Sequence, residues 1–310
     1  MIGILISKAV LFIGIYPNVT GPFGDGNLTL AGASHINIVA APGLGALSVG
    51  RDGSALMRVK GASTVDVGDG NVYVGRLKGS DGTLILSENS TLNAGWVGVG
   101  RNKTATGSED GGTGTVLLID SSLTAQNIVI GTNGFLGGRG TITGNVTNYG
   151  IFAPGLSPGT MEINGSFVAE AGSRLILEVE SDGHGGFNTD HVIFHNGQSV
   201  DLSHLNAEFR FLGNTDPNAF KAQGLFDVDT FFQVRQANNS LQDLAPAAFD
   251  TAVFSAQADK YTISNFTFSA ASGATFVAAA VPEPQSWAMM LAGLIAIGSL
   301  ARRRGRSAAD

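Results

Sequence analysis

Short runs of alternating apolar and polar residues fill the first half of the chain, with Gly, Asn and Asp between them. Alternation with a period of two places the apolar side chains on one side of an extended strand. Three such runs are each followed by a polar turn and a second short run. The first runs are Ala55–Val59, Thr83–Leu86 and Thr115–Ile119, and the second runs centre on Thr64, Thr91 and Leu123. The pattern predicts pairs of short strands with one buried side each.

A Val-Gly-Arg triplet recurs at a spacing of 25 residues, with its glycine at Gly50, Gly75 and Gly100. A related Ile-Gly-Thr triplet follows at Gly131, and the extra residues of this longer interval fall in the polar stretch 102–112. A period in the twenties with β-rich runs is typical of a solenoid, whose stacked rungs bury a continuous core. A β-sandwich of hairpins is the alternative. Because the period holds at 25 twice in succession, we expect a solenoid with stretch 102–112 looped out.

A second motif covers residues 131–167. It contains Gly140-Thr-Ile-Thr-Gly144, Ala153-Pro154-Gly155 and Ser157-Pro158-Gly159-Thr160. This stretch resembles the passenger-associated strand repeat of autotransporters. The resemblance implies a right-handed parallel β-helix, and it implies no particular activity.

The composition changes near residue 182, where glycine becomes rarer and phenylalanine frequent. Alternation predicts strands over Asn206–Leu212 and Tyr261–Phe268. Asp216 followed by Pro217 predicts the start of a short helix over Pro217–Gln223. We therefore expect a β-helical body over residues 25–182 and a β-rich cap or small β domain over 183–280.

Composition and charge narrow the functional classes. Among 310 residues there are 44 glycines, no cysteine and only 14% charged residues, and the net charge is −7. The absence of cysteine excludes disulfides and thiolate metal sites. The negative charge argues against nucleic acid as a partner. We expect no cofactor.

The C-terminal residues combine three features in a fixed order. A Val281-Pro282-Glu283-Pro284 segment precedes an apolar stretch from Trp287 to Ala301. A basic cluster then follows, made of Arg302, Arg303, Arg304 and Arg306. As a helix the apolar stretch spans about 22 Å, which is short for a hydrocarbon core of about 30 Å. The arginines predict a cytoplasmic C-terminus.

This arrangement over residues 281–306 resembles the PEP-CTERM sorting signal. The resemblance implies recognition and cleavage by an exosortase, a membrane transpeptidase. It also implies a precursor anchored in the inner membrane of a Gram-negative bacterium, and a mature form at the cell surface or outside the cell. PEP-CTERM systems are associated with exopolysaccharide and with biofilm formation.

The N-terminal residues 1–24 allow two interpretations. Lys8 precedes an apolar run from Ala9 to Tyr16 that fits the central region of a signal peptide. No small-x-small cleavage site follows closely, so a misplaced start codon is the alternative.

Few residues suggest chemistry. The repeat stacks Arg51, Arg76 and Arg101 into a column, which suggests contact with an anionic polysaccharide or, alternatively, a solvated turn position. The carboxylates of the repeat fall at different points of it: Asp52, Asp66, Asp81, Glu88 and Asp120. We therefore do not expect them to line one side of a catalytic cleft. His184, His191, His195 and His204 lie near aspartates, but their spacing matches no known metal motif, and we expect no metal site.

Two functional classes follow from these observations. The first is an exported structural or adhesive protein of the cell surface or extracellular matrix, and not an enzyme. The alternative is a polysaccharide-binding or polysaccharide-degrading enzyme built on a β-helix.

Overall fold

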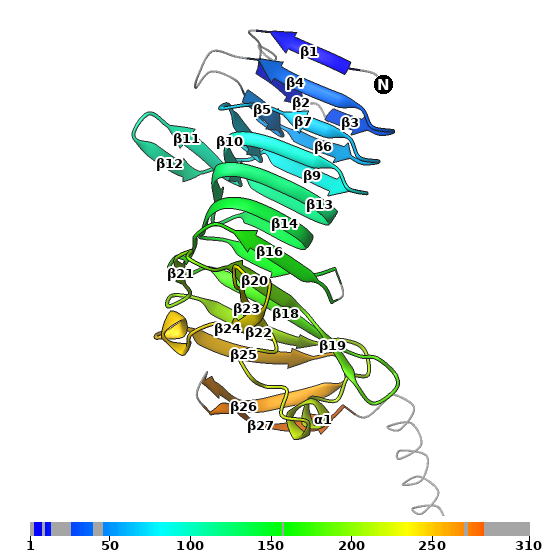
Figure 1. Cartoon of the computed structure of the whole chain (residues 1–310), viewed down its shortest axis with the longest axis vertical. Helices are drawn as coiled ribbons and strands as arrows, with labels where there is room; N and C mark the ends of the chain where they lie inside the picture. The colour runs from blue at the N-terminus through cyan, green and yellow to red at the C-terminus, as the bar shows by residue number, and fades with distance from the viewer. Residues whose placement is uncertain are drawn as a thin grey trace, which may run out of the picture.

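The structure, a computed structural model, describes residues 3–7, 10–13, 26–39, 46–156, 158–269 and 272–281. It is an all-β fold dominated by one large, mostly parallel sheet. The strands stack along the long axis of the molecule (Figure 1). They form three parallel ladders, which we call face A, face B and face C. Each turn of the chain adds a strand to each face in that order for most of the stack, the arrangement of a β-solenoid.

Face A runs along the whole described stack. Its strands are β3 (Gly26–Leu30), β6 (Ser54–Val59), β9 (Asp81–Ser87), the first parts of β13 (Thr113–Ile130) and β14 (Gly134–Asn148), β15 (Ile151–Pro154), β18 (Arg174–Ser181), β22 (Asn206–Phe211) and β25 (Val253–Ala258).

Faces B and C complete each rung. Face B consists of β1 (Gly3–Ser7), β4 (His35–Val39), β7 (Thr64–Asp66), the first part of β10 (Thr91–Val99), the middle parts of β13 and β14, β16 (Thr160–Asn164), β20 (His191–His195) and β23 (Phe232–Arg235). Face C consists of β2 (Val10–Ile13), β5 (Ala46–Val49), β8 (Asn71–Val74), the last parts of β10, β13 and β14, β17 (Phe167–Ala169) and β21 (Val200–Asp201).

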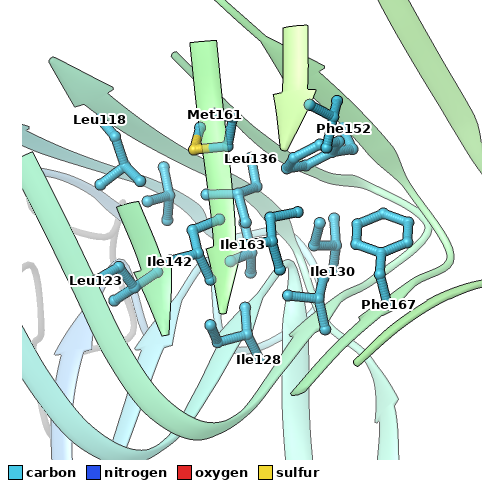
Figure 2. Close-up of a cluster of buried hydrophobic side chains, with 14 of the residues drawn as sticks. Leu118, Leu123, Ile128, Ile130, Leu136, Ile142, Phe152, Met161, Ile163 and Phe167 are labelled. Atoms are coloured by element: carbon cyan, nitrogen blue, oxygen red, sulfur yellow. The ribbon is translucent and has the colours of Figure 1, made fainter. Parts of the chain in front are cut away.

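The core lies between the three faces, because in most strands of described burial every second side chain points inward. Figure 2 shows this arrangement, with Leu118 and Leu136 from face A, Leu123 and Ile142 from face B, and Ile128 from face C pointing toward one another. All five are fully buried. The alternation read from the sequence therefore corresponds to the inward and outward sides of the strands.

The repeating glycines lie at equivalent corners, as the 25-residue period predicts. Val49, Val74 and Val99 are in register on face C, and the amide of Gly75 donates to the Val49 carbonyl at 2.9 Å. Gly100 repeats this bond one rung later, to Val74, at 2.7 Å. Gly50, Gly75 and Gly100 have φ of 70°, 69° and 61°, a conformation that favours glycine.

The predicted insertion forms an antiparallel hairpin outside the ladders. Its strands are β11 (Arg101–Thr104) and β12 (Gly107–Asp110). On either side of it, β10 and β13 remain paired in parallel from Thr91↔Ser122 to Val99↔Ile130. The prediction that this stretch loops out without disturbing the stack is confirmed.

Parallel pairing continues past residue 182 through β20, β22, β23 and β25. The later turns add excursions between ladder strands. They are β19 (Phe187–Thr189), α1 (Pro217–Ala222), β24 (Leu241–Asp243) and the 3-10 helix η1 (Pro246–Phe249). Asp216 caps α1 by accepting from the Asn218 amide at 2.9 Å, as its sequence predicts.

An antiparallel hairpin of β26 (Tyr261–Ser269) and β27 (Gly273–Ala280) follows the last parallel strand. Its inward-facing Phe266, Phe268 and Phe276 pack against the core. The hairpin thus covers apolar surface at the end of the stack. The expected division into a body and a cap at residue 182 stays a prediction.

Candidate polysaccharide-contact edge

Arg51, Arg76 and Arg101 follow the three corner glycines and lie along one edge of face C. The backbone links the first two corners, since the Arg76 amide donates to the Gly50 carbonyl at 2.8 Å. At Arg101 the chain turns into the hairpin, and the Gly112 amide donates to the corresponding Gly75 carbonyl at 3.1 Å. Rungs lie about 4.8 Å apart, so three unpaired guanidinium groups at this spacing would repel one another. Each arginine therefore needs a local partner, and each has a different one.

Carboxylates pair with two of the three arginines. Arg51 forms an ion pair with Asp52 at 2.6 Å, and Arg101 forms one with Asp110 of the hairpin, also at 2.6 Å. Arg76 instead donates to the Asn102 side chain at 3.0 Å, and its guanidinium carbon lies 4.1 Å from the centre of the Tyr73 ring. Among the described residues, Arg76 forms no ion pair, so no carboxylate offsets its charge there.

An aromatic pair lies beside Arg76 on the outward side of face C. The rings of Tyr73 and Trp96 are 5.5 Å apart in a tilted arrangement, and the ammonium group of Lys103 is 5.7 Å from the Trp96 ring centre. A side chain at Gly98 would overlap the Trp96 ring. The absence of a side chain there lets the indole lie flat across the strand. We did not predict this pair from sequence, although Gly98 two positions after Trp96 was a local signal.

The hairpin and its surroundings shield these rings. Tyr73 and Trp96 keep only 4% and 6% of their surface exposed although they point outward. Burial raises the pKa of Tyr73, against opposing contributions from Arg76 and Asn71. The two rings therefore pack against the neighbouring cations and leave no exposed aromatic surface on which a ligand could stack.

Asp110 ties the hairpin to the next rung. Its carboxylate accepts from the Thr132 hydroxyl at 2.8 Å and from the Thr132 amide at 3.2 Å, in addition to Arg101. Burial raises the pKa of Asp110, but these hydrogen bonds outweigh it and the pKa lies below its usual value. The ionised form is the one that holds the hairpin in place.

The carboxylates of the repeat are less scattered than the sequence suggested. Glu88 and Asp120 occupy the same corner on adjacent rungs, where the Asn89 amide donates to the Asp120 carbonyl at 2.9 Å. Corners of unequal length hid this equivalence, so that part of the sequence interpretation was wrong. Both oxygens of Asp120 are engaged by Arg139, at 2.7 and 2.8 Å.

The four histidines between residues 184 and 204 have separate partners. His191 contacts the Thr189 hydroxyl at 3.0 Å, and His195 contacts Glu162 at 2.9 Å. His184 contacts the Asp182 carbonyl, and His204 contacts Ser203. Within the described ranges, no three or more His, Asp or Glu side chains converge in a way that would hold a metal ion.

Asp190, one of the aspartates near these histidines, is fully buried, which its sequence context does not predict. One carboxyl oxygen accepts from the Gly159 amide at 2.8 Å, and the other accepts from the Glu178 amide at 2.7 Å. Burial raises the pKa of Asp190 to about 8, although both N–H groups act to lower it. With both oxygens engaged by backbone, Asp190 joins the loop after β15 to strand β18.

The sorting motif is described only at its first residue. The amide of Val281 donates to the Lys260 carbonyl at 2.8 Å, next to the hairpin β26–β27. Pro282, Glu283 and Pro284, the apolar stretch Trp287–Ala301 and the arginines at 302, 303, 304 and 306 lie outside the described residues. In the part of the chain that the structure describes, no helix has the length and apolar character needed to cross a membrane.

Comparisons of this chain with protein-family models, with curated proteins and with solved structures return no match.

Proposed function

We propose that this chain is an exported structural or adhesive protein of the bacterial surface or extracellular matrix, released from a membrane-anchored precursor by an exosortase. The observation that carries the proposal is the order of three elements in residues 281–306: a Pro-Glu-Pro motif, a short apolar stretch and an arginine cluster. The apolar stretch is short for a permanent anchor. The two prolines keep the cleavage region extended.

The finer description of the fold belongs to the same proposal. We take the stack to be a right-handed parallel β-helix, with residues 183–280 closing its end and Trp287–Ala301 as the single transmembrane helix of the precursor. A stack of this kind suits a matrix protein because its long sides offer repeated positions to an extended polymer.

The ligand in this proposal is an anionic polysaccharide, and Arg76 with Lys103 provides its main contact. Arg76 forms no ion pair within the described chain, and Lys103 is exposed beside Trp96. Arg51 and Arg101 contribute less, because Asp52 and Asp110 neutralise them. Charge-assisted contacts of this kind weaken with salt.

The tail is tested in the native host by replacing Pro282, Glu283 and Pro284 with alanine. The unaltered protein should be released with its C-terminus near Pro284, as read by intact mass. The altered protein should stay full length in the membrane fraction. Release of the altered protein, trimmed at the same place, would refute sorting by an exosortase.

The polysaccharide contact is tested separately on the purified protein with alginate as the probe. The double change Arg76→Ala and Lys103→Ala should weaken binding about tenfold at low salt. A matched control is Lys78→Ala, an exposed lysine of the loop between β8 and β9. If the double variant and the control bind alginate equally well, Arg76 and Lys103 do not form the polysaccharide contact.

A further inference from the structure

The outward side of face B carries two columns of polar, uncharged side chains over three consecutive rungs. Because Leu92, Leu123 and Ile142 point into the core and are fully buried, their neighbours in the strands point outward. These outward pairs are Thr91 and Asn93 on β10, Ser122 and Thr124 on β13, and Thr141 and Thr143 on β14. We call these six residues the hydroxyl array.

The array is regular because the three strands pair in register. Thr91 lies opposite Ser122, which lies opposite Thr141, and Asn93, Thr124 and Thr143 form the second column. Thr64 extends the first column at one end and Asn164 extends the second at the other. Neighbouring rungs are about 4.8 Å apart, so the array repeats along the stack on the scale of a single sugar ring.

Most of the hydrogen-bonding capacity of the array is unused. The Thr91 hydroxyl donates to Thr64 at 3.1 Å. Within the described residues, the side chains of Asn93, Ser122, Thr124, Thr141 and Thr143 form no hydrogen bond with the protein. Each hydroxyl or amide group can both donate and accept.

The other two faces differ from this one. The outward side of face A carries apolar side chains such as Ile85, Leu117 and Phe135. On face C the outward Tyr73 and Trp96 are buried beside the hairpin, and a single polar column continues at Asn127 and Asn145. Over these three described rungs, face B carries two uncharged donor and acceptor side chains on every strand. Its charged residues begin beyond the array, at Asp66 and at Glu162.

We propose that the hydroxyl array binds a neutral polysaccharide chain lying along the stack. A neutral sugar carries hydroxyl groups that donate and accept, as threonine does, and it carries no charge that would need a counterion. Two columns that run across successive rungs suit an extended polymer better than a compact ligand. Each hydrogen bond contributes little on balance, so useful affinity requires several rungs acting together. A role of this binding in an extracellular matrix rests on the proposed function, whereas the binding itself can be tested without it.

The test uses the purified full chain and hydroxyethyl cellulose, a soluble neutral glucan, in affinity electrophoresis. The triple change Thr124→Val, Thr141→Val and Thr143→Val removes three hydroxyls and keeps the branched shape that strands favour. We expect at least about a tenfold loss of affinity for the glucan, as several contacts are lost together. Binding to alginate should be unchanged.

The matched control is Thr83→Val with Thr115→Val, two registered, half-buried threonines on the outward side of face A. This control should bind the glucan as the unaltered chain does. If thermal unfolding shows that the triple variant is poorly folded, the single change Thr124→Glu, at an exposed position, should abolish glucan binding by placing a charge in the array.

Three results would overturn the inference: no retardation of the unaltered chain by the glucan, equal retardation of the Thr124→Glu variant, or equal loss in the face A control. Shaping of ice crystals by the unaltered chain without glucan binding would assign the array to ice instead. Failure here with normal tail processing and normal alginate binding would leave the proposed function in place. Glucan binding as expected, together with failed tail processing and failed alginate binding, would support the hydroxyl array and refute the proposed function.

Discussion

The early rungs, from β5 to β14, and the late rungs, from β15 to β25, build the same ladders in different ways. The early rungs turn through short corners at glycines such as Gly75 and fill the core with Val, Leu and Ile. The late rungs insert long excursions and fill the core with phenylalanine. Phe220 on α1 and Phe249 on η1 come from these excursions.

The comparison shows that the ladders tolerate different cores as long as the strand register is kept. Phe209 is the centre of the late core, with ring centroids 4.9 Å from Phe231 and 5.5 Å from Phe226. Excursions and the hairpin β26–β27 supply its neighbours, so the late rungs need tertiary packing from distant segments. The early rungs depend more on backbone fit between adjacent turns.

The largest effect is expected from Phe209→Ala in the late core. A fully buried phenylalanine replaced by alanine costs about 3–5 kcal/mol. Because each rung of a solenoid contacts mainly its neighbours, hydrogen exchange should accelerate in residues 206–280 and change little in 46–125. Leu92→Ala, at a fully buried position of the early core, should show the opposite distribution. Equal acceleration in both regions would mean that the stack unfolds as one unit.

A slightly smaller loss is expected from Gly75→Ala at an early corner. The residue has a φ of 69°, and an added Cβ would overlap the carbonyl oxygen of Thr113 on the next rung. We expect about 3 kcal/mol of lost stability in chemical denaturation. Gly79→Ala is the control, since its φ is 84° but no atom lies within 4 Å of the added Cβ. It should cost about 1 kcal/mol. Similar losses for both would show that conformation, and not rung spacing, selects glycine.

Asp190→Asn should destabilise the late rungs, where Asp190 joins the loop after β15 to β18, by about 1–3 kcal/mol at pH 5, because the amide NH₂ would face one of the two backbone N–H donors. It should also alter the pH dependence. The folded pKa of Asp190 is about 8 and the unfolded value is about 3.9, so the folded state binds more protons between these values. Its contribution to stability therefore falls as the pH rises through this window, by up to about 1.4 kcal/mol per unit.

The measurement for Asp190 is denaturant unfolding at several pH values from 4 to 9. The unaltered chain should lose stability toward pH 8 more steeply than the Asn variant. Parallel curves for the two proteins would show that this carboxyl does not titrate in the window.

The smallest effect is expected at the tip of the inserted hairpin. Replacing residues 104–107 by Asn-Gly keeps Arg101, Lys103 and Asp110 and removes the turn with the outermost strand pair, Thr104 and Gly107. Loop length contributes little to stability, so we expect a change of less than about 1 kcal/mol in thermal unfolding. Asp110→Ala should cost more, since it breaks the ion pair and the contacts to Thr132. A large loss from the shortened tip would make the turn part of the folded core.

Much of the fold could be predicted from the sequence because its signals are local. The 25-residue spacing located the corners at Gly50, Gly75 and Gly100, and alternation located strands in the early rungs and near residues 206–212 and 261–268. The Asp216-Pro217 pair located the start of α1. In each case a steric or hydrogen-bonding requirement acts within a few residues. It therefore restricts which residue types occur at those positions, and the pattern can be recognised in the sequence.

The candidate sites were harder to predict. Repeat spacing placed the three arginines on one edge, but it did not show that Asp110, nine residues after Arg101, would neutralise one of them. Glu88 and Asp120 came together because corners differ in length. The outward columns of threonine on face B follow from the register of β10, β13 and β14, which pairing between distant turns determines.

The sequence by itself determined the repeat, the inward and outward sides of the strands with clear alternation, and the motif order of residues 281–306. The tertiary structure alone decided which outward side chains become buried. Tyr73 and Trp96 are shielded because a hairpin lies beside them, and Asp190 is buried because a loop from an earlier turn lies over it. Burial of an outward side chain depends on what another segment places above it, and local pattern carries no information about that segment.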